Sequence, residues 1–464
     1  MLDEIKENWR NLFATAPQTL EKVKEVDTAV TAFNANVDAV LKISGKKLAE
    51  MIKNAGLSLE NVQDIKQTKL LEPHDVLKGI FKCFCGGIAE EWLTEDKVIY
   101  DWMMANLGYD RLQMGGQGGI VANVLGIIGV KKVIAHTNSH PKEQAQQFLK
   151  LDNIVSFDEN GQEKPSYQIN RTQDIPLIHW IIEFDKGDKI ELDGKTFVCP
   201  KSNRFIATYD PLNLKLVMDP HFVASTNSIK ADYVVLSGMH ALTSNNNGVA
   251  LVEKVLPIIN AWHKQGTVVH LEIASTQDIE VRKAILQKLA TNCDSIGINE
   301  RELIDILEVV GEEKLAQQCQ ENCHAENLFR ALLRVKEILK TPRIQLHFFG
   351  LYLTVQNKSF RITPEQNRNG MILASTIAAG KAGTGDINHK ENLLWALGKD
   401  VSEVGLKELE TISGIIEDKD LLTTGLSQYA GFDIIAVPTI LVEKPVTLVG
   451  MGDTISSVSL VGAR

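Results

Sequence analysis

The sequence predicts an α/β fold with two parts, a large domain built on a Rossmann-type parallel sheet and a smaller β-rich lid domain. From about residue 231 onward, short apolar runs alternate with helical stretches, which is the pattern of a parallel sheet covered by helices. Between about residues 165 and 220, apolar runs instead flank glycine-bearing turns, which indicates antiparallel strands. A chain of 464 residues with 44% hydrophobic content is long enough to bury a core in each part.

The alternating pattern assigns the elements of the large domain in order. An apolar-leaning run at 29–33 ends in polar residues. Apolar runs predict later strands at 233–238, 267–273, 295–299, 343–349 and 445–449. Apolar residues at helical spacing predict helices at 120–128, 246–265, 281–289, 301–310, 326–340 and 455–460. This is a doubly wound topology, in which ligands bind at the carboxyl ends of the strands.

The lid is predicted from an interruption of this pattern. Apolar runs at 178–184 and 190–198, with glycine-bearing turns, predict a hairpin. Antiparallel strands inserted into a parallel fold indicate a lid that closes over a substrate and excludes water. The predicted boundaries assign 1–38, 111–164 and 216–464 to the large domain and 39–110 and 165–215 to the lid.

Composition limits the classes of function. The net charge of −10, from 49 basic and 59 acidic residues, argues against nucleic-acid binding. The N-terminus lacks the pattern of a signal peptide, and no apolar run reaches the roughly 18 residues of a membrane span. The six cysteines show no disulfide framework. We therefore expect a cytoplasmic protein whose partners are small molecules.

The segment Gly450-Met451-Gly452-Asp453 holds the most informative chemistry. It lies between the apolar run at 445–449 and a helix-compatible stretch, so it is predicted as a glycine turn from strand to helix. Bare amides at the start of a helix bind anions. Asp453 then either caps the helix or accepts a proton from a hydroxyl that attacks a phosphorus atom there. Gly383-Thr384-Gly385-Asp386 repeats the pattern, but it follows a helical stretch, and we therefore prefer Asp453.

Two further clusters have the composition of a sugar site. Asn36 and Asp38 lie on one face if their segment is extended, and they could bind hydroxyl groups or form an Asx turn. Gly116 and Gln117 belong to a run of four glycines around one glutamine, which lets the backbone approach a ligand closely. A dinucleotide fingerprint needs a different spacing and a strand immediately before it, and neither is predicted here.

Carboxylates at two predicted strand ends indicate a magnesium site. His270-Leu271-Glu272 alternates along a strand, which places His270 and Glu272 on one face. Asn299 and Glu302 open a helix directly after the next strand. Such oxygen ligands, direct or through water, suit Mg²⁺. Each cluster could equally be a capped or salt-bridged end of an element.

These motifs, in this order, resemble the ADP-dependent sugar kinases, a family of phosphofructokinases and glucokinases within the ribokinase-like superfamily. The resemblance extends over nearly the whole chain and includes Asn203-Arg204-Phe205-Ile206 in the lid. It implies a Rossmann-like large domain, a β-rich lid, and transfer of a phosphoryl group from ADP, with Mg²⁺, to a sugar hydroxyl. ADP as the donor rests on the resemblance alone.

The resemblance also implies roles for individual residues. Asp453 would be the general base, with Gly450, Met451 and Gly452 lending amides to the phosphoryl group. Glu272, Glu302 and Asp453 would organise Mg²⁺, and Asn299 would face the phosphates. The remaining implied sets are Asn36, Asp38, Gly116 and Gln117 for the sugar, and Gly425, Leu426 and Ser427 for the nucleotide.

The acceptor sugar follows less directly. Fructose 6-phosphate needs cations for its phosphate, and Lys186, Lys201 and Arg204, beside Asn203, lie in the predicted lid. In the family, a glutamate in the segment 87–92 accompanies glucokinase activity, and either Glu90 or Glu91 could fill that role. We predict an ADP-dependent phosphofructokinase. The alternatives are a glucokinase or bifunctional enzyme, an ATP-dependent kinase of the ribokinase type, and a non-catalytic sugar sensor.

Overall fold

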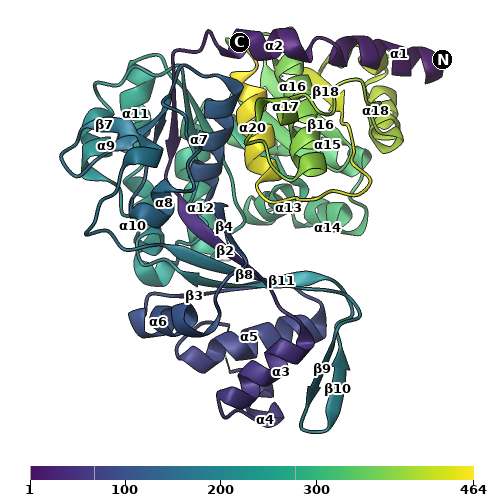
Figure 1. Cartoon of the computed structure of the whole chain (residues 1–464). Coiled ribbons are helices and arrows are strands. Elements are labelled where there is room, and N and C mark those ends of the chain that lie inside the picture. The colour runs from purple at the N-terminus through teal and green to yellow at the C-terminus, as the bar shows by residue number, and fades with distance from the viewer. Residues whose placement is uncertain (1, 67, 277) are drawn as a thin grey trace.

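The protein has two lobes, each built on its own sheet (Figure 1). The structure, a computed structural model, describes residues 2–66, 68–276 and 278–464. An 11-stranded sheet forms the large lobe and a five-stranded sheet the small lobe. Each sheet has its own hydrophobic core. This agrees with a large α/β domain and a smaller β-rich one.

The large sheet is parallel through its centre. In spatial order its strands are β17 (Leu426–Tyr429), β18 (Phe432–Pro438), β16 (Leu351–Asn357), β15 (Arg343–Phe348), β14 (Ser295–Asn299), β13 (Val268–Glu272), β12 (Tyr233–Leu236), β1 (Thr28–Ala32), β5 (Lys132–Ala135), β6 (Ile154–Phe157) and β7 (Glu163–Pro165). The run from β15 to β6 is parallel throughout, which confirms the predicted alternation. Antiparallel strands extend both edges.

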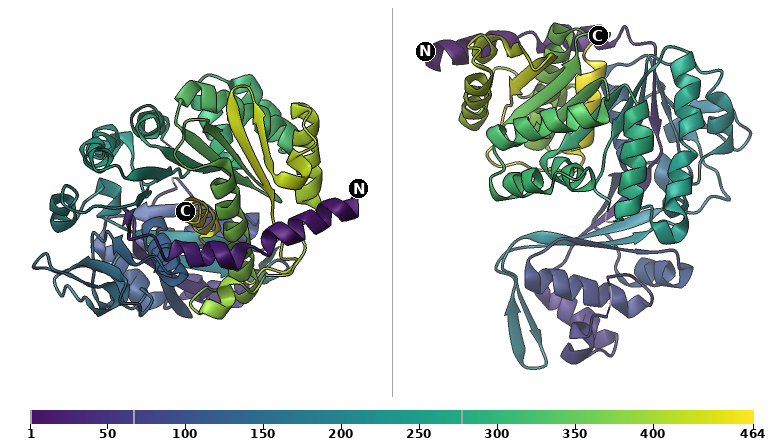
Figure 2. Two further views of the ribbon diagram at one scale, coloured as in Figure 1. Left: turned by 90° about the horizontal axis from the view of Figure 1, so that it is seen from above. Right: turned by 180° about the vertical axis from the view of Figure 1, so that it is seen from behind.

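Helices cover both faces of the large sheet. One face carries α7 (Gln117–Ile128), α16 (Pro364–Thr384) and α20 (Met451–Val461), and the other carries α11 (Leu256–Lys264), α13 (Glu300–Val309), α15 (Ala325–Leu339) and α18 (Glu403–Ile416). The other α-helices of this lobe are α1 (Leu2–Phe13), α2 (Ala16–Val23), α8 (Lys142–Ala145), α9 (Pro220–Ser225), α10 (Gly248–Glu253), α12 (Ile279–Ala284), α14 (Glu313–Glu321), α17 (Lys390–Leu393) and α19 (Leu421–Thr424). The N-terminal helices, dark purple in Figure 2, cross the end of the large lobe remote from the small lobe.

The small sheet has helices on one face only. Its strands, in order, are β3 (Glu90–Thr94), β11 (Asn203–Tyr209), β8 (Ile178–Phe184), β2 (Asn36–Lys42) and β4 (Arg111–Gly115). The helices are α3 (Gly45–Asn54), α4 (Leu59–Gln63), α5 (Pro73–Gly86) and α6 (Lys97–Asn106). Because side chains alternate along a strand, each strand sends one set of residues into the helix-covered core and the other to the opposite face, toward the large lobe (Figure 1).

The sheets place the lobe boundaries slightly differently from the sequence prediction. The predicted boundary at residue 38 falls inside β2, and β4 begins where the lid was expected to have ended. Asn36 is in register with Gly115, and Asp38 with Gln113, so both strands belong to the small sheet. The polar segment after β1 therefore continues as a lid strand and is not a turn.

Three local predictions were wrong. The run at 445–449 forms no strand; Val446 and Leu448 are 69% and 67% exposed, because the sheet already ends at β17 and α20 packs directly on its face. The run at 178–184 does not pair with 190–198: β8 pairs with β11 and β2, and the hairpin is β9 (Lys189–Leu192) with β10 (Lys195–Val198). The predicted helix at 246–265 is two helices, with Pro257 in the first turn of the second.

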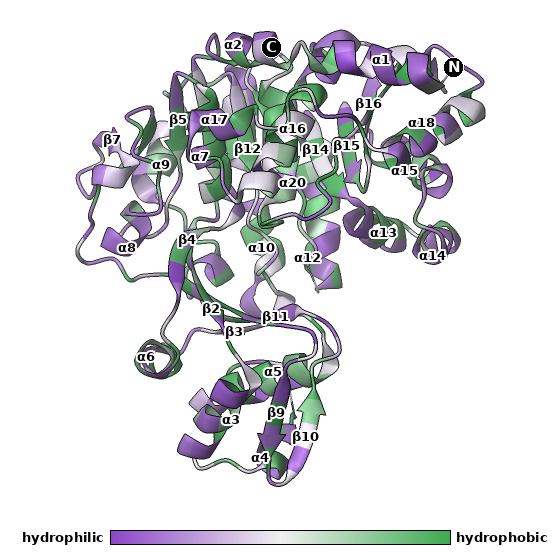
Figure 3. Ribbon diagram, turned by 45° about the vertical axis from the view of Figure 1, so that its right-hand side comes forward, coloured by the Kyte–Doolittle hydropathy of each residue, from purple (hydrophilic) through white to green (hydrophobic). Residues whose placement is uncertain are grey.

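Hydropathy follows the layers. In Figure 3 the central strands of the large sheet are mostly green, whereas outer helices such as α14 carry much purple. Within the described residues, no helix combines the length and apolar character needed to cross a membrane.

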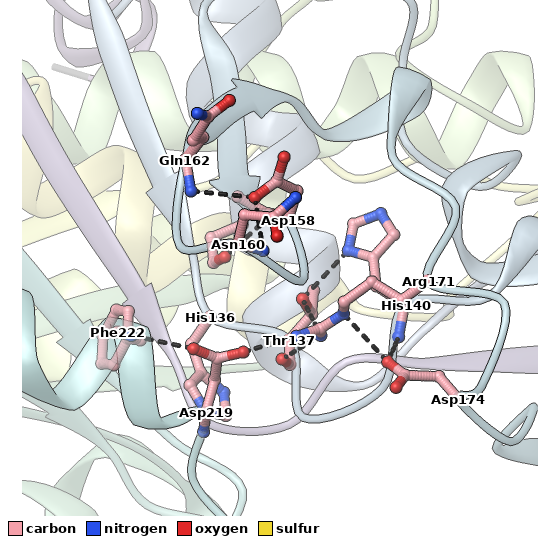
Figure 4. A network of polar contacts seen from close by, with 12 residues as sticks. His136, Thr137, His140, Asp158, Asn160, Gln162, Arg171, Asp174, Asp219 and Phe222 are labelled. Carbon is pink, nitrogen blue, oxygen red and sulfur yellow. Dashed lines mark hydrogen bonds and ion pairs between the residues drawn. The ribbon is translucent and has the colours of Figure 1, made fainter.

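A buried arginine network joins the segments that cross between the lobes (Figure 4). Arg171 lies on the connection from β7 to β8 and is 9% exposed. Its guanidinium pairs with Asp219 at 2.5 Å and with Asp174 at 2.9 Å, and it donates to the Thr137 carbonyl at 2.8 Å. The buried positive charge is thus balanced by two carboxylates.

Two histidines extend this network to the other crossing segments. His136 Nδ1 lies 2.9 Å from the Phe33 carbonyl, directly after β1, and its Nε2 accepts from the Asp219 amide at 2.9 Å. His140 Nε2 lies 2.8 Å from the Ser166 carbonyl. Burial lowers the pKa of both histidines to about 4, so both are neutral at pH 7. We refer to Arg171, Asp174, Asp219, His136 and His140 as the hinge network.

Candidate active site

The site lies at the topological switch point of the large sheet. From β1 the chain passes through α7 to β5 and β6 on one side, and it later returns to β12 and proceeds to β15 on the other. Crevices of this kind bind ligands in open α/β sheets. Asn34 follows β1 and Gly238 follows β12, and a Cβ on Gly238 would lie 2.6 Å from the Asn34 Cβ. The close approach therefore requires glycine.

The start of α20 faces this point with free amides. Gly450 takes a left-handed conformation, φ 62°, and α20 begins at Met451. The glycine N-cap offers no side chain to the first-turn N–H groups, so they stay available for an anion. Burial raises the pKa of Asp453 in this turn, whereas Lys381, Gln117 and His240 lower it. The glycine turn and helix agree with the sequence prediction, but the turn follows an irregular segment.

The glycine-rich segment connects this turn with the lid. A Cβ on Gly115 would lie 2.1 Å from Asp38 Oδ1, and one on Gly116 would lie 2.7 Å from Asn36 Oδ1. Gln117 Oε1 accepts from the Gly238 amide at 3.2 Å, and its side chain lies near enough to Asp453 to lower the pKa of that carboxyl group. A strand, β4, does run directly into this segment, contrary to the prediction that none precedes it.

Polar groups on the open face of the lid sheet gather beside the same segment. Asn36 donates to Asp38 Oδ1 at 2.9 Å, and Thr208 donates to Glu91 Oε1 at 2.6 Å. His179 is in register with both Asp38 and Thr208. Burial raises the pKa of Asp38. The predicted pair Asn36 and Asp38 is therefore joined by residues from three more strands.

The structure separates the two glutamates that the sequence left undecided. Glu90 lies on the helix side, where its carboxylate accepts from Lys82 at 2.6 Å and from Trp92 Nε1 at 2.8 Å. Glu91 lies on the open face with Thr208. Glu91, and not Glu90, therefore lies on the face of the small sheet that is turned toward the large lobe.

His179 was missed by sequence reasoning. Burial lowers the pKa of its imidazole, but the hydrogen bond and charge of Asp210, with the nearby Glu91 and Asp38, raise it by more. Its Nε2 lies 3.0 Å from Asp210 Oδ2. The signal was present in the sequence, because the alternation of Ile178–Phe184 puts His179 opposite the apolar face.

The predicted metal ligands Glu272, Glu302 and Asp453 lie near enough for their charges to interact. Burial raises the pKa of Glu272 well above its usual range, and the charges of Glu302 and Asp453 raise it further. Burial also raises the pKa of Glu302 to about 8. His270, on the same face of β13, lies 3.3 Å from Glu272, but burial and nearby Arg343 lower the pKa of His270, so it supplies no counter-charge. Within the described residues, no three such side chains are close enough to hold a metal directly.

Asn299 and Glu302 also form a capping box at the start of α13. Asn299 Oδ1 accepts from the Glu302 amide at 2.9 Å, and Glu302 Oε2 accepts from the Asn299 amide at 2.8 Å. Asn299 and Glu302 therefore do cap the start of α13, which is the structural role that the sequence left open beside magnesium binding. It leaves one Glu302 oxygen and the Asn299 NH₂ group for a ligand.

Close packing around Glu272 fixes the residues beside it. A Cβ on Gly297 would lie 2.0 Å from Glu272 Oε2, and one on Gly452 would lie 3.0 Å from His347 Nε2. His347 is buried with no hydrogen-bond partner for its Nδ1 among the described residues. The turn before Asp453 thus packs directly on the His347 side chain of β15, because Gly452 has no side chain of its own.

Of the three lid cations, only Arg204 lies on a strand of the open face. Arg204 is in register with Glu183, four residues along β8 from His179. Lys186 and Lys201 are exposed in the adjoining turns. None of these three has an ion-pair partner among the described residues. Asn203 instead donates to the Gly87 carbonyl at 3.1 Å, so it caps α5 on the helix side.

Gly425, Leu426 and Ser427 are not brought to the site. A Cβ on Gly425 would lie 2.8 Å from Trp9 of α1, and Ser427 donates to Asp418 at 2.5 Å. This segment lies beside the N-terminal helices, remote from the lid, because β17 runs along the outer edge of the sheet.

An apolar cavity of about 600 Å³ lies beside the start of α20 instead. Its lining includes Phe349, Leu441, Val442, Pro445, Leu448 and Met451. Phe349 and Leu448 are 68% and 67% exposed, so the cavity has an open apolar rim. The exposed run that was predicted as a strand therefore forms part of a pocket wall.

This fold and site define a small-molecule phosphotransferase with a lid. The sequence profile described as the ADP-specific phosphofructokinase/glucokinase conserved region matches residues 27–462. The chain belongs to this family.

Relatives of known name span the whole chain. An ADP-specific phosphofructokinase of Methanosarcina acetivorans is 28% identical over 480 residues, which cover 97% of this chain and 96% of that protein. An ADP-dependent glucose/glucosamine kinase of Pyrococcus furiosus is 30% identical over 463 residues, which cover 98% of each. The chain is thus similar both to a relative named as a phosphofructokinase and to one named as a glucose/glucosamine kinase.

Solved structures agree with the fold. The structure of a last common ancestor of ADP-dependent phosphofructokinases from Methanosarcinales superposes with a TM-score of 0.86 at 28% identity, covering 100% of this chain and 98% of that one. An ADP-dependent kinase in complex with fructose 6-phosphate and ADPβS has a TM-score of 0.82 at 28% identity, covering 98% of this chain and 97% of that one.

Proposed function

We propose that this protein transfers the β-phosphoryl group of ADP to fructose 6-phosphate, producing fructose 1,6-bisphosphate and AMP. The observation that carries the proposal is the segment 115–117, which joins the lid cluster of Asn36 and Asp38 to Asp453 at the start of α20. A hydroxyl held by the lid face would then meet a base and an anion site together. The named relatives support ADP as the donor.

The residues divide the reaction between the two lobes. Asn36, Asp38, Glu91, Gly116 and Gln117 bind the sugar and orient the hydroxyl that attacks. As the bond between the β-phosphorus and the bridging oxygen breaks and AMP leaves, the sugar oxygen forms the new bond to phosphorus. Its proton passes to the Asp453 carboxylate. Positioning supplies much of the barrier reduction in such displacements.

The start of α20 stabilises the phosphoryl group in transfer. The Gly450 turn aims the amides of Met451 and Gly452, together with the helix dipole, at the oxygens where negative charge spreads. The apolar cavity beside Met451 is the proposed place for the nucleotide base, in place of the predicted Gly425, Leu426 and Ser427.

Magnesium fits the donor set. Burial and nearby carboxylate charges raise the pKa values of Glu272 and Glu302. A cation beside them and Asp453 would stabilise the charged carboxylates. Oxygen donors of this kind suit Mg²⁺, and these residues would hold it, partly through water. When bound, the ion neutralises phosphate charge. Asn299 is placed to donate to a phosphate oxygen.

The positively charged residues of the lid favour fructose 6-phosphate over glucose as the acceptor. Arg204 on the open face, with exposed Lys186 and Lys201 in the adjoining turns, supplies the positive charge that a sugar phosphate requires, and none of the three has an ion-pair partner among the described residues. Glucose needs no such cations, but Glu91 lies on the open face as glucokinase activity would require. Glucose is therefore the second candidate acceptor, as an alternative or an additional activity.

The test compares donors and acceptors under matched conditions. Initial rates with Mg²⁺ are measured for ADP and ATP, each with fructose 6-phosphate and with glucose. We expect the highest kcat/KM with ADP and fructose 6-phosphate. Arg204→Met should raise KM for fructose 6-phosphate and leave KM for glucose unchanged, whereas Glu91→Gln should affect glucose more. Preference for ATP, or activity with neither sugar, would overturn the proposal.

A further inference from the structure

Lys381 of α16 reaches across to the turn that precedes α20. Its ammonium group donates to the Gly450 carbonyl at 3.2 Å and to Thr454 Oγ1 at 3.2 Å. Neither the sequence motifs nor the proposed mechanism uses this residue. The contact joins the glycine turn to a helix that packs along the whole of α20.

The Gly450 carbonyl is held by three donors. Besides Lys381, it accepts from the Thr454 amide at 3.1 Å and from Thr454 Oγ1 at 2.7 Å. A Cβ on Gly450 would lie 2.8 Å from Ile120 Cδ1 and 3.1 Å from Lys381 Nζ, and the backbone has φ 62°. The left-handed conformation disfavours a capping residue such as Ser or Asp here.

This arrangement solves a conflict in the turn. A capping side chain would fix the backbone but would occupy the first-turn N–H groups. Glycine leaves those groups free for a ligand, but it also leaves the turn with the most conformational freedom of any residue. An ammonium group on the carbonyl side fixes the same peptide from behind and blocks no amide.

We propose that Lys381 is a positioning residue for phosphoryl transfer, which holds the Gly450 carbonyl so that the amides of Met451 and Gly452 stay aimed at the phosphoryl group. The inference rests on the proposed function. Among the described residues Lys381 makes no ion pair with Asp453, although its charge lowers the pKa of that carboxyl group, and it holds the turn through the Gly450 carbonyl. Its loss would therefore weaken interactions made in the transition state and leave sugar binding on the lid intact.

The test compares Lys381→Met with Lys381→Arg. A misplacement of about 1 Å in a site of this kind lowers turnover by up to about 100-fold. We expect Lys381→Met to lower kcat by about 10- to 100-fold, with KM for fructose 6-phosphate changed less than about twofold. Lys381→Arg keeps a donor at the carbonyl and should recover most of kcat.

Lys336→Met is the matched control. Lys336 is a second buried lysine, which donates to Asn357 Oδ1 at 2.6 Å and lies 4.8 Å from the Phe432 ring centroid. Its removal tests the effect of losing a buried lysine outside the site. We expect it to lower the midpoint of thermal unfolding without lowering kcat at a temperature where the protein stays folded.

Each result decides the inference. A kcat for Lys381→Met within twofold of wild type would overturn it, as would an equal loss of kcat in Lys336→Met or no recovery in Lys381→Arg. If Lys381→Met does not fold, Lys381→Gln and Lys381→Arg give the same comparison. Absence of ADP-dependent activity in the wild-type protein would instead count against the proposed function, so the two failures are distinguishable.

Discussion

The hinge network and the carboxylate cluster at the start of α20 both bury charged groups, but they balance charge in opposite ways. In the hinge network, Arg171 pairs with Asp219 and Asp174, and the histidines are neutral with both ring nitrogens in contact with polar groups. In the cluster, the charges of Glu302 and Asp453 raise the pKa of Glu272, and the charge of Asp453 raises the pKa of Glu302.

This difference distinguishes buried charges that stabilise the fold from buried charges that serve a function. A network in which opposite charges are paired stabilises the folded state. Its charges need no ligand to balance them. A cluster of like charges opposes folding until a cation or a substrate arrives, which makes it a candidate site. Substitutions should therefore act mainly on stability in the hinge network and mainly on activity in the cluster.

The largest expected effect is that of Asp453→Asn on turnover. The amide keeps the size of the side chain but accepts no proton, so kcat should fall by about 10²–10⁴-fold with little change in KM for the sugar. Steady-state kinetics measure this. Asp386→Asn is the control, because Asp386 lies in the similar glycine-aspartate segment after α16 and accepts from the Asn388 amide. Near-normal kcat for Asp453→Asn would exclude the base assignment.

The next effect concerns stability in the hinge network. Arg171→Met removes a guanidinium that two carboxylates share and leaves buried Asp219 without its cation. Breaking a buried pair in this way lowers stability by about 3–5 kcal/mol. Urea unfolding measures it, with Arg334→Met as the exposed control, expected to change stability by less than about 1 kcal/mol. Equal effects of the two substitutions would contradict the comparison.

The hinge histidines should make stability fall in mild acid. Burial lowers the folded pKa of His136 and His140 from 6.5 to about 4, so the unfolded chain binds protons first as pH falls below 6.5. Between pH 7 and 5.5 each should remove about 1 kcal/mol of stability. His140→Phe keeps the ring that stacks on Phe148. Its stability deficit relative to wild type should shrink over this pH range; a constant deficit would show that His140 does not titrate.

Much of this architecture could be predicted from the sequence, because parallel strands and their helices are local patterns. The strands at 267–273 and 295–299 follow from apolar runs that end in polar residues, and they place Glu272 and Asn299 at one edge. The run at 445–449 has the same apolar character, yet it forms no strand, because pairing depends on space at a sheet edge. That space is set by distant parts of the chain.

The site shows the same limit. Asp453 and Gln117 are recognisable because glycines flank them in the sequence, and Asp38 because it follows an apolar run and shares an extended face with Asn36. Whether Glu90 or Glu91 faces the cleft depends on which face of β3 the lid helices cover. The pairing of Arg171 with Asp219 and that of Lys381 with Gly450 left no local signal, since these partners lie 48 and 69 residues apart. Long-range partners of this kind appear only once the fold is known.

The last expected effect is a gain in stability from Glu302→Gln, which tests directly whether the carboxylate cluster opposes folding. Burial raises the folded pKa of Glu302 from 4.5 to about 8, so its contribution to stability falls as pH rises from 4.5 through 8. Glutamine keeps the capping box on Asn299 and removes the charge. Without divalent cations, the stability of the variant relative to wild type should rise by about 3 kcal/mol between pH 5 and pH 8, while its kcat with Mg²⁺ is lower. Chemical denaturation at the two pH values measures this. A variant that is less stable at pH 8 would mean that Glu302 is balanced like Arg171, and the cluster would then be structural.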